Sequence, residues 1–65
     1  MEQKLKEIIK QNPNCKITFH LLSGKNQTYD PVNGSIDVRT TYLHYPDNNR
    51  IVIIAIDKIE CVEIN

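Results

Sequence analysis

The sequence contains little of what many functional classes require. It has no Trp, one Phe, two Gly and no excess of either charge, because eight Lys and Arg balance eight Asp and Glu. A formal net charge of zero argues against a protein that binds mainly by neutralising a phosphate backbone. Gly24 and Gly34 are too few for a phosphate-binding glycine loop, and we expect both in turns.

Long hydrophobic runs are also missing. A membrane-spanning helix needs ~20 apolar residues, whereas the longest apolar run, residues 51–56, has the length of a strand. The alternating charges near the N-terminus are not typical of a signal peptide. We therefore expect a cytoplasmic protein that does not contact a membrane. In that compartment Cys15 and Cys61 are expected to stay reduced and to act as small apolar packing residues.

The apolar residues that are present favour strands. Ten Ile and four Val outnumber four Leu and one Ala, and branching at Cβ suits a pleated sheet better than a helix. Residues 2–11 are the exception, because Leu5, Ile8 and Ile9 form a narrow apolar stripe with helical spacing. Pro13 ends this predicted helix. A helix this short is only marginally stable in water, and its apolar stripe must therefore dock on the rest of the chain.

The remainder of the chain is predicted to form five strands separated by turns. Residues 51–56 are apolar on both faces, so one face is expected to fill the interior. The opposite face then needs a cover, which is either the N-terminal helix or a second subunit. The predicted strands are residues 15–22, 27–29, 36–42, 51–56 and 59–64.

This order of elements resembles the Sm-like family of small barrels, and within it the Hfq-like RNA chaperones. Residues 21–24 resemble the end of that family's first strand and its turn, and Ile36-Asp37 resembles the apolar–Asp step before its third strand. Residues 51–64 resemble its closing pair of strands. The Tyr-Lys-His joint of the family is absent, and residues 55–58 read Ala-Ile-Asp-Lys instead.

The resemblance implies a mainly β fold with one N-terminal helix. The expected architecture is a single domain over residues 1–65, with the helix in 1–12 and a small five-stranded antiparallel barrel, Sm-like or SH3-like, in 15–64. In Sm-like rings the last two strands pair edge to edge between subunits, and here both are apolar and weakly guarded by charge. We therefore expect a homo-oligomer, and the candidate interface residues are Ile51, Ile53, Ile59 and Cys61.

No pattern of catalytic or metal-binding residues is present. The serines lie beside glycines in turns, where serine is common in any case. The cysteines and histidines lack the two close pairs that structural zinc sites usually show. We expect no enzymatic activity, no metal and no cofactor. The residues weighed for these roles are Cys15, Ser23, His20, Ser35, His44 and Cys61.

Aromatic and basic residues gather around the turn at Pro46. Aromatic rings and guanidinium groups are the side chains that stack on single-stranded bases. The candidate contacts for RNA or a nucleotide are Tyr42, His44, Tyr45, Arg50 and Lys58. In the alternative interpretation Tyr42 belongs to the core and the others only flank the turn.

Two functions remain open from the sequence. The first is a non-enzymatic, oligomeric, Sm-like module that binds RNA or a nucleotide in a regulatory role. The second is a small protein-binding regulator or inhibitor that acts through a strand edge or surface contacts.

Overall fold

The computed structural model describes all residues from 1 to 65 and shows a mainly β protein with one N-terminal helix, as predicted. Two short 3₁₀ helices, η1 (Pro31–Asn33) and η2 (Ile56–Lys58), interrupt the strands. The longer elements are α1 (Glu2–Gln11), β1 (Ile17–Leu21), β2 (Asn26–Tyr29), β3 (Asp37–Val38), β4 (Tyr42–Pro46), β5 (Ile51–Ala55) and β6 (Ile59–Ile64).

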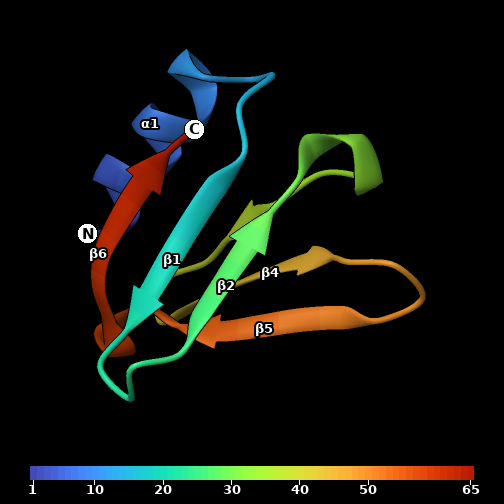
Figure 1. Ribbon diagram of the computed structural model, residues 1–65. Helices are drawn as coiled ribbons and strands as arrows, with labels where there is room; N and C mark the ends of the chain where they lie inside the picture. The colour runs from blue at the N-terminus through green and yellow to red at the C-terminus, as the bar shows by residue number, and fades with distance from the viewer.

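The strands form two antiparallel sheets rather than the expected five-stranded barrel. One sheet has the order β2-β1-β6 and the other β3-β4-β5, and neither is closed (Figure 1). The chain leaves the second sheet after β5, turns through η2 and enters the first sheet as β6. Because no strand of one sheet pairs with a strand of the other, each sheet keeps two free edges. The prediction of a closed barrel was therefore wrong.

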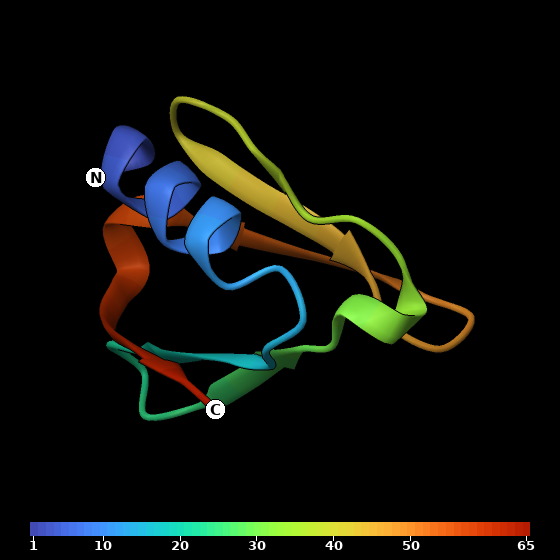
Figure 2. The same cartoon turned by 90° about the horizontal axis from the view of Figure 1, so that it is seen from above.

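The inner faces of the two sheets enclose the core, and α1 lies at one side of the space between them (Figure 2). Phe19 of β1 and Tyr45 of β4 meet there, with 6.2 Å between their ring centroids. Leu5 of α1 is 1% exposed and joins the same cluster. The whole core consists of Leu5, Ile17, Phe19, Tyr29, Val38, Leu43, Tyr45, Val52, Ile54, Ile56 and Ile59.

The helix has the predicted extent and end. The Glu2 carboxylate and the Lys6 ammonium group lie 3.0 Å apart, one turn along the helix. At the C-terminal end, the Asn12 backbone N–H donates to the carbonyl of Ile9 at 3.2 Å, and its side-chain amide donates to that of Ile8 at 2.9 Å. These bonds occupy carbonyls that would otherwise lack a partner.

The predicted strand over residues 36–42 is divided in two by a turn at residues 40–41. The N–H of Arg39 donates to the carbonyl of Tyr42 at 2.8 Å, which closes this turn between β3 and β4. From there the alternation restarts, so that Leu43 and Tyr45 face the core whereas Tyr42 and His44 face outward.

A tight hairpin turn then fixes the register of β4 and β5. Asn48 and Asn49 have φ angles of 43° and 40°, the left-handed region that a two-residue type I′ turn requires. On either side, Asp47 and Arg50 exchange backbone hydrogen bonds of 2.8 and 3.3 Å. The resulting register places Tyr45 opposite Val52 and leaves β5 at the edge of its sheet.

Only one face of β5 is covered within the chain. Val52 and Ile54 point into the core, whereas Ile51 and Ile53 are 62% and 68% exposed. The helix contacts β3 at the opposite edge of the sheet, so the expectation that α1 covers this strand is wrong. The other cover expected from the sequence is a second subunit, and it stays a prediction.

Candidate binding surface

The outward side chains of β4 and β5 form one continuous surface, which we call the outer face. Cross-strand pairs align His44 with Ile53, Tyr42 with Ala55 and Pro46 with Ile51. None of these six residues carries a carboxylate, an ammonium or a guanidinium group. The outer face is therefore an uncharged, largely apolar surface on a strand pair whose β5 edge is unpaired.

Two aromatic side chains stack on this surface. The rings of Tyr42 and His44 have centroids 5.9 Å apart and an interplanar angle of 25°. Tyr42 is 40% exposed, so its ring packs on the imidazole and remains partly accessible to solvent. The Asp37 carboxylate lies 3.4 Å from Nε2 of His44 and 2.9 Å from a guanidinium nitrogen of Arg39. An ion pair thus borders the outer face on the β3 side.

Tyr45, a candidate RNA contact, lies in the core instead. It is fully buried, with the Tyr29 ring edge-on at 5.3 Å and the Phe19 ring stacked on it. Burial, reinforced by the negative charge of Asp47 and partly offset by Arg50, raises the pKa of the Tyr45 hydroxyl to about 12. This hydroxyl has no hydrogen-bond partner. Its ring is therefore not available to a ligand.

The two basic candidates lie far apart along β5. Arg50 precedes the strand and its guanidinium group contacts the carboxylate of Asp47 through two nitrogens, the closer at 2.7 Å. Lys58 follows the strand in η2 and lines a small crevice of about 280 Å³ between β5 and the turn after β1. Of the five candidate contacts, the structure brings only Tyr42 and His44 together.

The candidate interface residues also divide into two groups. Ile51 and Ile53 are exposed on the free strand β5, whereas Ile59 is only 8% exposed and belongs to the core. Cys61 is exposed on β6 in the other sheet, opposite His20 of β1. An interface formed through β5 would therefore include Ile51 and Ile53 but not Ile59 or Cys61.

The residues weighed as metal ligands do not converge. No group of three or more His, Cys, Asp or Glu side chains is placed to hold a metal ion. His20 instead pairs with Glu63, and both Cys15 and Cys61 carry free thiols.

None of the helices combines the length and the apolar character that crossing a membrane requires.

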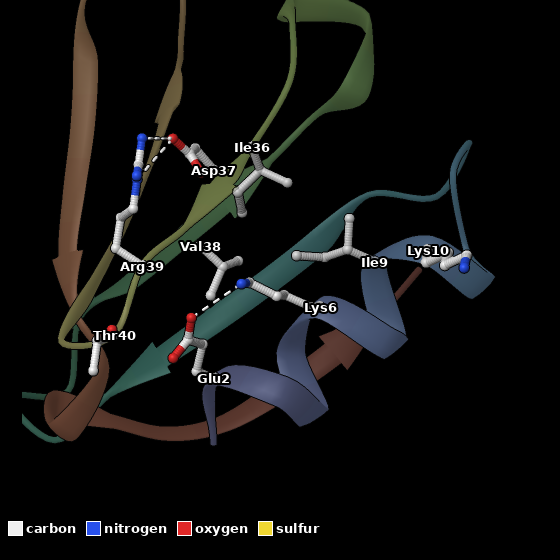
Figure 3. A pocket seen from close by; sticks show the side chains of 9 residues that line it. All are labelled: Glu2, Lys6, Ile9, Lys10, Ile36, Asp37, Val38, Arg39 and Thr40. Atoms are coloured by element: carbon white, nitrogen blue, oxygen red, sulfur yellow. Dashed lines mark hydrogen bonds and ion pairs between the residues drawn. The ribbon is translucent and has the colours of Figure 1, made fainter.

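A crevice of about 480 Å³ separates α1 from the free edge of β3. Figure 3 shows Ile9 of the helix facing Ile36 and Val38, so the floor of this crevice is apolar. The charges at its rim are largely paired, because Lys6 contacts Glu2 and Arg39 contacts Asp37 (Figure 3). Lys10 is the one charged residue of this lining without an ion-pair partner (Figure 3).

The largest crevice, about 670 Å³, lies at the end of the outer face. It is bounded by the turn at residues 40–41, the ring of Tyr42, the end of β5 and η2. Met1 also lines this crevice, and its only charged side chain is that of Asp57, which is exposed and takes part in no ion pair. Asp57 is not among the candidate residues of the sequence, because the crevice depends on the turn between β3 and β4.

No protein-family model, curated protein sequence or solved structure matches this chain. The Sm-like resemblance thus rests on the order of elements alone, and the closed barrel that it implied is not formed.

Proposed function

We propose that the protein is a non-enzymatic, protein-binding module that assembles as a homo-oligomer through the free edge of β5. One observation carries this proposal: Ile51 and Ile53 are more than half exposed on an edge strand that contains no charged residue. Natural edge strands are normally protected by charge, proline or a covering element. Full burial of an Ile side chain contributes ~1.5–3 kcal/mol. Pairing with a second strand covers only part of Ile51 and Ile53, so a fraction of this free energy favours association.

The hydrogen-bonding pattern of β5 suits pairing with a second copy of itself. Asp47 and Arg50 form a hydrogen-bonded pair, and such pairs alternate along an antiparallel ladder. Val52 and Ile54 therefore bond to β4, whereas Ile51, Ile53 and Ala55 direct their N–H and C=O groups to the free edge.

A two-fold axis at Ile53 would use every one of these free groups. Ile53 then pairs with Ile53 of the second copy, and Ile51 pairs with Ala55, so a large side chain lies beside a small one. No like charges meet, because β5 has none. The product is one continuous sheet whose outer face carries two Tyr42–His44 pairs.

The composition of the outer face favours a protein ligand over RNA. Phosphate binding requires free cations, whereas Arg50 is held by Asp47 and Lys58 lies beyond the far end of the strand. An uncharged surface of Tyr, His, Pro and Ile is instead typical of the centre of a protein–protein interface. The two free thiols, Cys15 and Cys61, support the accompanying proposal of a cytoplasmic location.

The assembly is tested by sedimentation velocity at several concentrations. The wild-type protein is expected to associate at micromolar concentration, and Ile53→Lys to remain monomeric with an unchanged circular dichroism spectrum. Val32→Lys is the matched control, since Val32 is 89% exposed in η1, away from β5. A wild-type protein that stays monomeric at high micromolar concentration contradicts the proposed assembly.

The ligand class is tested separately by cross-linking followed by capture. A protein partner is expected to be retained by wild-type protein and Val32→Lys but lost with Tyr42→Ala, a change on the outer face away from the dimer axis. Retention of the same protein by Tyr42→Ala would contradict the outer face as the docking surface.

The stack of Tyr42 on His44 favours one second candidate, the binding of RNA or a nucleotide. A single-stranded base stacked on an aromatic ring contributes ~1–3 kcal/mol. If this candidate holds, single-stranded RNA binds at low salt, its affinity falls steeply with added salt, and Tyr42→Ala weakens it. The protein-binding proposal predicts no such binding.

A further inference from the structure

The free edge of β3 leaves one backbone donor and one backbone acceptor without a partner in the sheet. The N–H of Arg39 donates to the carbonyl of Tyr42 at 2.8 Å, which makes these two residues a hydrogen-bonded pair. Such pairs alternate along an antiparallel ladder, so the neighbouring Val38 of β3 directs its N–H and C=O groups away from β4. Val38 is only 6% exposed, so little water replaces the missing strand.

This edge borders the crevice of about 480 Å³ between β3 and α1 (Figure 3). The helix cannot pair with the edge, because the backbone groups along an α-helix bond within the helix itself. Residues 36–40 all line the crevice, so it follows the strand for ~17 Å. Ile9 and Ile36 contribute to its apolar floor and are only partly buried.

From this arrangement we propose that the crevice binds an extended peptide segment of another protein, which adds to β3 as a further antiparallel strand and carries an acidic residue. The peptide residue opposite Val38 supplies both the C=O and the N–H that the free edge requires. Its side chain lies on the same face as that of Val38 and covers Ile9 and Ile36. A helical segment cannot take this place, because its backbone groups are already bonded.

The charges around the crevice favour an acidic residue on the peptide. The Lys6–Glu2 and Arg39–Asp37 ion pairs, at 3.0 and 2.9 Å, leave no net charge between them. Lys10 has no carboxylate within 4.0 Å, and Figure 3 places it at one end of the crevice. An acidic side chain at that end of the bound peptide therefore pairs with Lys10.

The probe is the blocked heptapeptide Glu-Thr-Val-Thr-Val-Thr-Glu, titrated into the full-length protein and followed by ¹⁵N chemical-shift changes. We expect saturable changes at the amides of residues 36–40, with a dissociation constant on the order of 1 mM. N-methylation of both Val residues of the peptide is expected to weaken binding at least about tenfold, because it removes the N–H that donates to the carbonyl of Val38. N-methylation of the Thr residues should leave the affinity unchanged, since their N–H groups point away from β3.

Variants of the helix then test the acidic contact. Lys10→Gln is expected to weaken the heptapeptide about twofold to fivefold. The same variant should not change the affinity for a peptide in which Gln replaces both Glu residues. Lys4→Gln is the matched control, because Lys4 is also an exposed lysine of α1 without an ion pair but lies outside the crevice. Its affinity is expected to equal that of the wild-type protein.

A last variant separates this site from the assembly through β5, on which it does not depend. Ile53→Lys blocks the β5 edge and leaves β3 at the other edge of the sheet, so it should bind the heptapeptide as the wild-type protein does. Loss of binding in Ile53→Lys would assign the peptide to β5 and overturn the proposal. Equal affinities of the two N-methylated peptides would also overturn it, and would leave the β5 assembly intact.

Discussion

Two core tyrosines with opposite hydrogen-bonding states lead to a pair of opposite mutational effects. The hydroxyl of Tyr45 is buried without a partner, whereas that of Tyr29 donates to the carbonyl of Gly34 at 2.9 Å. Both residues are at least 94% buried. Tyr→Phe therefore removes an unsatisfied group at one position and a formed hydrogen bond at the other, with the ring packing kept in both.

The magnitudes follow from the cost of leaving a buried polar group unpaired, which is ~1–3 kcal/mol. Tyr45→Phe is expected to raise the free energy of unfolding by about 1 kcal/mol and the Tm by ~4–8 °C for a chain of this size. Tyr29→Phe is expected to lower the free energy of unfolding by roughly 1 kcal/mol, since its hydrogen bond to Gly34 is lost.

Urea denaturation followed by far-ultraviolet circular dichroism measures both changes, with equal m-values as the sign that only stability has changed. If Tyr45→Phe were destabilised as much as Tyr29→Phe, the Tyr45 hydroxyl would have to be hydrogen-bonded in the folded protein.

Three further changes test other parts of the fold. Gly34→Ala is expected to lower the free energy of unfolding by roughly 1 kcal/mol more than Gly24→Ala, as measured by urea denaturation. The reason is that a Cβ added at Gly34 lies 2.6 Å from Cγ of Pro46, whereas a Cβ added at Gly24 meets open space. Asn49→Gly relieves a φ of 40° and is expected to raise the Tm through a gain of roughly 0.5 kcal/mol, and an unchanged or lower Tm would contradict the turn type. The pKa of Tyr45 is raised to about 12, so the phenol of the unfolded chain ionises first, near pH 10. The free energy of unfolding therefore falls between pH 10 and pH 12, by roughly 2–3 kcal/mol. Urea denaturation over a pH series should show a smaller fall in Tyr45→Phe.

The parts of the fold that local patterns specify were predictable from the sequence. The stripe of Leu5, Ile8 and Ile9 before Pro13 predicted α1, and the apolar run at residues 51–56 predicted β5. The joint at Asp57 predicted the break before β6, because two charged residues interrupt an apolar stretch.

The division of the predicted strand at residues 36–42 had no local signal. Thr40 and Thr41 are β-branched and favour a strand, yet they form the turn between β3 and β4. That turn reverses which tyrosine is buried, so Tyr45 rather than Tyr42 enters the core. Whether the strands close into a barrel could not be predicted from local patterns either, because the sequence of a strand does not show whether its edge is paired or free.

Of the candidate site, the sequence identified the residue types but not their grouping. The sequence indicated Tyr42 and His44 as RNA contacts, and Ile51 and Ile53 as interface residues. The register of β4 and β5 places all four on one surface.

Amide hydrogen exchange across β5 at several protein concentrations tests the proposed association most directly. The N–H groups of Val52 and Ile54 bond to β4 and should be protected at every concentration, whereas those of Ile51, Ile53 and Ala55 face the free edge. If copies pair through β5, protection of these three amides rises as the protein is concentrated. Fast exchange of all three at high micromolar concentration would contradict assembly through this strand.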